Sequence, residues 1–157
     1  MNEYMKEADL LVKENLIKEE GGPFGAVVVK DGKIIGRGHN KVIKNNDPTA
    51  HAEIVAIREA CKNIKTYDLT GCSIYTTCYP CPMCLSAIIW SNIKKVYYGN
   101  TKEDAADIGF RDEFIYEYID KLSKGIDDGT LKLKNINRSK TIKEFEEYMN
   151  KDEKTLY

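Results

Sequence analysis

Two short stretches of the chain carry residue types that can hold a metal ion and move a proton, namely His51–Glu53 and Pro80–Cys84. Cys81 and Cys84 are spaced i, i+3, which on a helix places their Cβ atoms on one face, about 5–6 Å apart. Two thiolates at that separation can share one Zn²⁺, with His51 as a third, nitrogen ligand. Three protein ligands leave a tetrahedral ion one open position, which is typical of a catalytic zinc site.

Glu53 can serve as the proton carrier of such a site only if its helix begins close to His51. Residues two apart in a regular helix point about 200° from each other, so the two side chains would otherwise face different ways. They converge if His51 enters from the non-helical side and Glu53 lies in the first turn, which the break at Pro48 allows. A carboxylate there can take a proton from water activated by zinc and pass it to a ring nitrogen or a departing amine.

Each stretch alone has a simpler interpretation. A Cys-x-x-Cys pair is also typical of a thioredoxin-like redox site. Cys78 could add a fourth ligand, which would give a closed, structural Cys₃His zinc site in a protein that is not an enzyme. The order His-x-Glu followed by Pro-Cys-x-x-Cys is more specific, because it matches the pattern of zinc-dependent nucleobase deaminases.

Length and composition narrow the remaining possibilities. A chain of 157 residues, 42% of them hydrophobic, predicts one domain over residues 1–157. The formal charge of −1 argues against nucleic acid as a partner, although Lys132, Lys134, Arg138 and Lys140 form a local basic run. No apolar run is long enough to span a membrane, and the residues at the start of the sequence predict no secretory signal. Together with five cysteines, this predicts a reduced, cytoplasmic protein.

The elements that must position these residues follow from hydrophobic spacing and turn residues. We expect helices at 2–20, 49–64 (with Thr49 as N-cap), 80–90, 112–122 and 142–149, and strands at 25–30, 33–37, 72–77 and 95–99, with a polar loop at 40–48. Helices alternating with strands after an opening hairpin predict an α/β fold, a three-layer α/β/α sandwich around a mixed central sheet. Residues 123–157 are expected to form a more polar C-terminal tail. His39, at a strand end, has no partner that the sequence reveals.

The chain resembles the cytidine-deaminase-like superfamily, and within it the small bacterial guanine deaminases. The matching stretches are Gly22–Gly32, Asn46–Glu53, Cys78–Cys84 with Ala87–Trp90, and Ala105–Asp112. With the segments between them they cover residues 5 to 120. The resemblance implies hydrolysis of guanine to xanthine and ammonia. Other members of the superfamily, tRNA adenosine deaminases and cytosine deaminases, are the alternatives.

The resemblance also implies a role for individual residues. His51, Cys81 and Cys84 would hold one zinc ion per chain, and Glu53 would be the proton shuttle. Contacts to the base would come from Phe24, Asn40, Ala52 (through its backbone N–H), Trp90 and Asp112. Several of these have a purely structural alternative, since Phe24 and Trp90 can pack in the core, Asn40 can turn a loop and Asp112 can cap a helix.

The resemblance further implies a homodimer, in which exchanged C-terminal segments bring Tyr157 to the neighbouring subunit's site. One position departs from the family pattern, because Tyr79 stands where relatives commonly carry glutamate. A phenol with a pKa near 10 stays neutral at pH 7 and cannot replace a carboxylate facing guanine's N–H edge. Tyr79 is therefore expected to influence which amino-heterocycle is accepted.

Overall fold

The computed structural model describes residues 2–157 and divides them into two units, residues 2–116 and residues 117–157. The division falls inside helix α6 (Glu113–Ser123), a few residues before the tail expected from residue 123. The first unit contains the sheet and both metal-ligand stretches. The second contains the end of α6 and helix α7 (Arg138–Met149). That the whole chain forms one domain stays a prediction.

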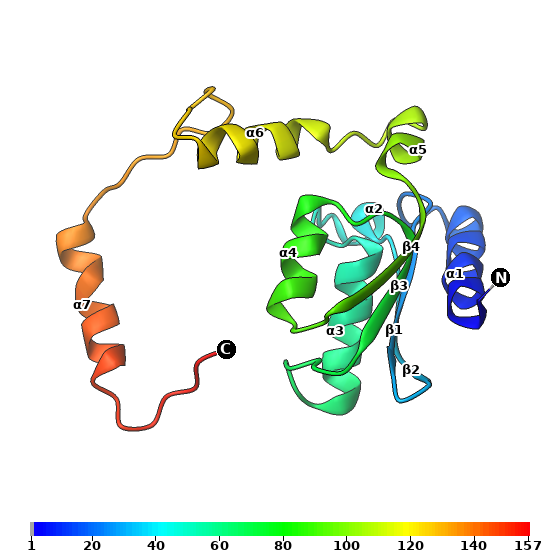
Figure 1. Ribbon diagram of the computed structural model, residues 1–157, viewed down its shortest axis with the longest axis horizontal. Helices are drawn as coiled ribbons and strands as arrows, with labels where there is room; N and C mark the ends of the chain where they lie inside the picture. Colours follow the sequence, from blue (N-terminus) through cyan, green and yellow to red (C-terminus); the bar gives the residue numbers. More distant parts are fainter. Residues whose placement is uncertain (1) are drawn as a thin grey trace. The chain divides into compact units, whose positions relative to one another are not determined.

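A four-stranded mixed sheet forms the centre of the first unit, with strand order β2-β1-β3-β4 (Figure 1). Its strands are β1 (Gly25–Lys30), β2 (Lys33–His39), β3 (Ser73–Cys78) and β4 (Lys95–Asn100). β1 is antiparallel to both β2 and β3, whereas β3 is parallel to β4. Asp31 and Gly32 turn the β1–β2 hairpin with φ angles of 48° and 74°, as the Asp-Gly dipeptide predicts.

Helices cover both faces of this sheet (Figure 1). Helix α1 (Glu3–Lys18) packs on one face against β1, β2 and β3. Helices α3 (Ala52–Ile64) and α4 (Pro82–Trp90) lie on the other face and contact each other. Ala26, Val28 and Ile74 of the strands are fully buried in the core that lies between the sheet and helices α3 and α4. The predicted α/β/α sandwich with a mixed sheet is confirmed.

Close packing of α3 on β2 depends on two glycines of that strand. A Cβ atom at Gly36 would collide with the carbonyl oxygen of Ala56, and one at Gly38 with the carbonyl oxygen of Ala52. The helix backbone therefore lies directly against the strand. Because Ala52 is the first residue of α3, this contact also fixes where the helix begins relative to the sheet.

The helix starts differ from the predicted ones in a way that matters for the site. Helix α3 begins at Ala52 with His51 as N-cap, so the predicted N-cap, Thr49, is wrong. The Asp47 carboxylate accepts hydrogen bonds from both the backbone N–H and the hydroxyl of Thr49, at 2.8 and 2.6 Å, which holds Thr49 in a turn outside the helix. Similarly, α4 begins at Pro82, with Cys81 as its N-cap.

Two short helices were not predicted. Helix α2 (Val42–Asn45) interrupts the expected polar loop, and α5 (Lys102–Asp107) follows β4. The α5 start carries a capping box, in which Thr101 and Asp104 bond to each other's backbone N–H. In residues 2–157, no helix is long and apolar enough to cross a membrane.

Candidate metal centre and active site

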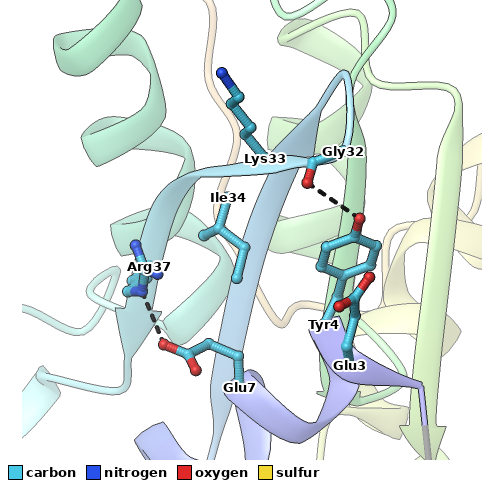
Figure 2. Close-up of a pocket in the computed structure, with 7 residues that line it drawn as sticks. All are labelled: Glu3, Tyr4, Glu7, Gly32, Lys33, Ile34 and Arg37. Carbon is cyan, nitrogen blue, oxygen red and sulfur yellow. Dashed lines mark hydrogen bonds and ion pairs between the residues drawn. The ribbon is translucent and has the colours of Figure 1, made fainter.

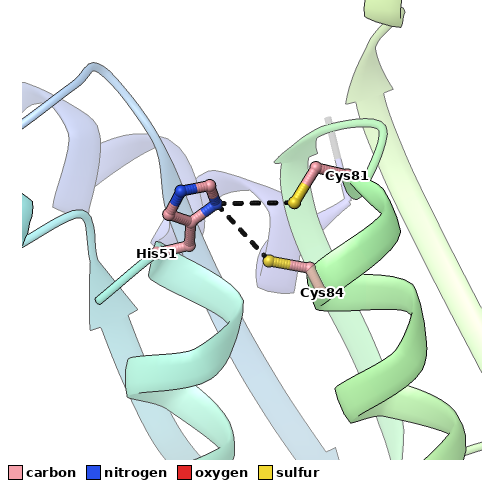
Figure 3. Close-up of side chains that lie close together, drawn as sticks. All are labelled: His51, Cys81 and Cys84. Carbon is pink, nitrogen blue, oxygen red and sulfur yellow. Dashed lines mark hydrogen bonds between the residues drawn. The ribbon is translucent and has the colours of Figure 1, made fainter. Parts of the chain in front are cut away.

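Two helix N-termini bring the predicted metal ligands together. His51 caps α3, Cys81 caps α4, and Cys84 lies one turn into α4. Figure 3 shows the imidazole ring at the head of α3 facing the two sulfur atoms across the gap between the helices. In the described part of the chain, these three residues form a group whose ligand atoms all lie within 4.8 Å of one another.

The spacing of the ligand atoms fits a zinc ion. Nδ1 of His51 is 3.6 Å from Sγ of Cys81 and 3.6 Å from Sγ of Cys84. A tetrahedral zinc, with bonds of about 2.3 Å to sulfur and about 2.05 Å to nitrogen, would separate sulfur from nitrogen by about 3.6 Å. Cys78 is not part of the group, and its thiol donates to the carbonyl oxygen of Thr101 at 3.4 Å. The arrangement therefore favours three protein ligands over the closed Cys₃His alternative.

The charges of the site point to a cation as well. A hydrogen bond from the Cys84 thiol, with help from His51, lowers the pKa of Cys81 to about 4. The same interaction with Cys81, together with burial, raises the pKa of Cys84. Two thiolates side by side repel each other, so the opposite pKa shifts favour ionisation of Cys81 alone when no cation is bound. A divalent cation between them would supply the missing positive charge and allow both to ionise.

Glu53 lies in the first turn of α3 and is 6% exposed. Its Oε1 accepts a hydrogen bond from the hydroxyl of Thr76 at 3.1 Å, and its Oε2 accepts one from the Cys84 thiol at 3.4 Å. Burial is the main reason that the pKa of Glu53 is raised. The predicted convergence of His51 and Glu53 is therefore observed, since His51 precedes the helix and Glu53 belongs to it. A buried carboxyl group whose pKa is raised is well suited to carrying a proton near neutral pH.

A cavity of about 650 Å³ opens onto this cluster. Its volume lies within the range of small-molecule sites, roughly 300–1,000 Å³. His51, Glu53 and Cys81 contribute to its wall, together with four of the residues predicted to contact a substrate, Phe24, Asn40, Tyr79 and Asp112. Much of the remaining wall is apolar, formed by Pro23, Val42, Ile43, Pro48, Phe110, Phe114 and Ile115.

The predicted substrate contacts in this wall are held in defined orientations. The ring of Phe24 packs edge-on against Phe110, with 4.9 Å between centroids. Asn40 is 4% exposed, and its Oδ1 accepts the backbone N–H of Val42 at 3.1 Å, so its amide N–H₂ group is the part expected to donate to a ligand. Burial is the main cause of the raised pKa of Asp112, and the nearby charge of Cys81 adds to it.

Three other predicted contacts are not among the residues that line the cavity. Trp90 ends α4, whose nine residues make it about 13 Å long, and Cys81 caps the opposite end. The Trp90 side chain is 67% exposed, so the structure does not bring it to this cavity. The side chain of Ala52 is fully buried, and the contact expected from its backbone N–H stays a prediction. Tyr157 belongs to the second unit, and its role stays a prediction.

Sequence reasoning missed several cavity residues. Phe110 and Phe114 contribute aromatic surface, and Lys102 and Arg111 contribute the cavity's two lysine or arginine side chains. Phe110 stands beside Gly109, whose φ of 95° marks a tight turn, and this Gly-Phe pair was the available signal. The hydroxyl of Tyr116 donates to the carbonyl oxygen of Pro80 at 3.1 Å and so ties the start of α6 to the residue before Cys81.

A second cavity, of about 450 Å³, lies between α1 and the β1–β2 hairpin (Figure 2). Two of its charged side chains, those of Glu7 and Arg37, form an ion pair at 2.9 Å. The hydroxyl of Tyr4 donates to the carbonyl oxygen of Gly32 at 3.2 Å. This cavity shares no lining residue with the first and contains no metal-ligand group of the kind described above.

A family model described as the cytidine and deoxycytidylate deaminase zinc-binding region matches residues 1–100. The chain belongs to this family. As a member of this deaminase family, the chain is a zinc-dependent aminohydrolase, and His51, Cys81 and Cys84 are the residues positioned to hold its metal.

Individual members of the deaminase family are similar over different lengths. Guanine deaminase of Bacillus subtilis is 54% identical over 118 residues, which are 75% of this chain and 76% of that protein. The crystal structure of guanine deaminase from Bacillus subtilis matches with a TM-score of 0.91 and 45% identity, covering 100% of this chain and 99% of the other. A tRNA-specific adenosine deaminase of Buchnera aphidicola is 52% identical over 88 residues, 55% of this chain and 58% of that protein.

Proposed function

We propose that this aminohydrolase converts guanine and water to xanthine and ammonia. The observation that carries this choice of substrate is the similarity to a guanine deaminase structure over the whole chain, the C-terminal unit included. The similarity to the tRNA adenosine deaminase covers only 55% of the chain. The near-balanced charge agrees with a small-molecule substrate rather than a polyanion.

The cavity offers a base both kinds of hydrogen-bonding partner. The amide N–H₂ of Asn40 can donate to a ring nitrogen or carbonyl oxygen, and the carboxylate of Asp112 can accept from ring or amino N–H groups. Guanine presents acceptors and donors around one planar ring system. Phe24 and Phe110 supply aromatic surface for that ring.

Glu53 is proposed to move the proton that the reaction requires. His51, Cys81 and Cys84 would hold a zinc ion, which would acidify water and so supply the nucleophile at neutral pH. The Glu53 carboxylate takes one proton from the attacking water and delivers it to a ring nitrogen as the C–O bond forms. It then takes the proton of the added hydroxyl and delivers it to the amino group, which leaves as ammonia as the C–N bond breaks and the carbonyl forms. The hydroxyl of Thr76 donates to Oε1 and keeps the carboxylate directed toward the cavity.

Ammonia release from separate substrates tests this proposal. Free guanine, adenine, cytosine, a pterin and a tRNA anticodon stem-loop are offered to the zinc-loaded protein, with and without a chelator. We expect release from guanine well above the others and its loss on chelation. Release from the stem-loop alone would replace guanine deamination with tRNA editing, for which Lys102 and Arg111 in the cavity wall would provide phosphate contacts.

Tyr79 is proposed to tune the choice of base. It lines the cavity, and its ring meets Tyr98 edge-on with 5.0 Å between centroids. A neutral phenol offers one donor and one acceptor, whereas a carboxylate only accepts, so the two groups favour different ring edges. In the same assay, Tyr79→Glu is expected to shift the ratio of rates between guanine and the other bases. An unchanged ratio would remove Tyr79 from the determinants of specificity.

A homodimer with exchanged C-terminal segments is also part of the proposal. β4 is an edge strand, with Tyr97 and Tyr98 46% and 50% exposed. Residues 131–136 form no helix or strand, and Leu131 and Leu133 are 53% and 66% exposed. Their alternate spacing suits an added strand with one apolar face, and a sheet edge can accept such a strand from a second copy.

A cytoplasmic location is proposed as well, since thiols stay reduced in that compartment and can serve as thiolate ligands.

A further inference from the structure

A buried polar pair lies outside the cavity, next to the residue proposed to bind the base. Nε2 of His39 is 2.6 Å from Oε2 of Glu20, and their side chains are only 10% and 15% exposed. The second carboxylate oxygen of Glu20 accepts a hydrogen bond from Lys44 at 2.6 Å, and that lysine is 52% exposed. Neither Glu20 nor His39 is among the residues lining the cavity.

Glu20 also holds the backbone around Asn40. Its carbonyl oxygen accepts the N–H groups of Ile43 and Lys44, at 3.1 and 3.0 Å. Glu20 therefore bonds to the residue before Asn40 through its side chain and to the third and fourth residues after Asn40 through its backbone. The end of β2 and helix α2 are joined through this one residue.

The Asn40 side chain is in close contact with the same segment. A Cβ atom added to Gly21 would collide with Oδ1 of Asn40, so the residue after Glu20 packs directly against the amide. The Asn40 Oδ1 is held in turn by the N–H of Val42. A displacement of Glu20 would therefore change the orientation of the Asn40 amide. Hydrogen bonds prefer angles above about 150° and weaken steeply below about 120°, so a rotated amide would bind a ligand less tightly.

We propose that Glu20 and His39 are positioning residues, which orient the amide of Asn40 toward the base. The inference rests on the proposed function, in that Asn40 is taken to contact the substrate. Removing the pair weakens the binding of guanine in the ground state and leaves the proton transfer at Glu53 unchanged. Its signature is a raised KM with kcat largely retained.

The test compares three single variants of the zinc-loaded protein. His39→Leu breaks the pair, His39→Gln keeps an N–H₂ donor for the Glu20 carboxylate, and Lys44→Gln removes only the exposed partner. We expect KM for guanine to rise about tenfold in His39→Leu, with kcat within about threefold of the parent. The other two variants should stay within about threefold of the parent in both constants. An unchanged KM in His39→Leu, or an equal rise in Lys44→Gln, would overturn the proposal.

A double-mutant cycle separates positioning from a general effect on the fold. In an Asn40→Ala background, His39→Leu should raise KM no further, because the group it orients is gone. An equal rise in both backgrounds would contradict the proposal. The side-chain amide signals of Asn40 in an NMR spectrum give a readout without turnover, and they should move in His39→Leu but not in Lys44→Gln. If the parent protein releases no ammonia from guanine, the proposed function fails, while these signals still decide the inference.

Discussion

At the scale of single residues, Glu53 is the side chain that distinguishes catalysis from metal binding. Glu53→Gln keeps the size of the side chain and its bond with Thr76 but removes the group that accepts the proton. We expect one zinc per chain and a kcat lower by about 10²–10⁴-fold. Ammonia release and zinc content measure the two effects. Full activity in this variant would exclude Glu53 as the shuttle.

The candidate site was largely predictable at this scale because its spacing is local. His51, Glu53, Cys81 and Cys84 lie within a few residues of two helix starts, and the geometry of a helix start follows from nearby sequence. The pairing of His39 with Glu20 was not predictable, since it joins residues 19 apart whose approach depends on how α1 packs on the sheet.

Trp90 is a predicted substrate contact that does not line the cavity that opens onto the metal ligands. It follows Cys84 on the same helix in the sequence, but the structure places it at the far end of α4 from the metal ligands. Phe110, which does line the cavity, comes from a turn far along the chain. Nearness in sequence correctly predicted that Trp90 and Cys84 share a helix, whereas the contact of Trp90 with a base stays a prediction.

At the scale of the elements, contact between β2 and α3 determines where His51 lies. Gly38→Ala places a methyl group against the backbone of α3. We expect this overpacking to lower the free energy of unfolding by about 1–3 kcal/mol, measured by urea denaturation. Lys33→Ala, at an exposed position of the same strand, should change it by no more than about 0.5 kcal/mol. Equal effects of the two substitutions would contradict the close packing.

Glu20 lies in the connection between α1 and β1, and its carboxylate bonds to Lys44 of α2. Because this carboxylate titrates, the free energy of unfolding should depend on pH in the acid range. Hydrogen bonds from Lys44 first, and from His39 second, lower the pKa of Glu20 from its ordinary 4.5 to about 2. The ionised carboxylate therefore stabilises the fold above about pH 4.5, and this contribution is lost as the pH falls from about 4.5 to about 2.

Glu20→Gln removes the titrating group and tests that dependence. The difference in unfolding free energy between parent and variant should be constant above about pH 5 and shrink as the pH falls toward 2. Loss of zinc in acid affects both proteins equally and cancels in the difference. A difference that stays constant down to pH 2 would contradict the assigned pKa.

The elements themselves were mostly predictable, and their boundaries were less so. Asp31 and Gly32 identified the hairpin because their dipeptide favours a tight turn with positive φ angles. The start of α3 was predicted too early, because the carboxylate of Asp47 accepts hydrogen bonds from Thr49 and holds that residue in a turn outside the helix. Helix α5, only six residues long, is too short to show hydrophobic periodicity, although its Thr101–Asp104 capping box was present.

At the scale of the whole molecule, the second unit is proposed to act in a dimer. Leu133 is 66% exposed and lies in a segment without helix or strand. If residues 131–136 pair with the partner's β4, Leu133→Asp should place a charge on the apolar face of the added strand and favour the monomer. Light scattering coupled to size-exclusion chromatography measures the change in mass. Lys132→Asp, whose side chain would face the other way, is the matched control.

The mass of the parent protein is decisive for this part of the account. A monomeric parent would refute the exchanged dimer. A dimer equally resistant to both substitutions would place the interface elsewhere.

The division of the chain at residue 117 was not visible in the sequence, because α6 runs through it without a glycine, proline or change of pattern.

The account depends above all on a metal held by one nitrogen and two sulfurs, with room for a water molecule. X-ray absorption at the zinc edge of the loaded protein measures this directly. We predict two sulfur neighbours at about 2.3 Å and two nitrogen or oxygen neighbours at about 2.0–2.1 Å, unchanged in Cys78→Ala. Three sulfur neighbours, with one lost in Cys78→Ala, would reveal a closed structural site and contradict the account.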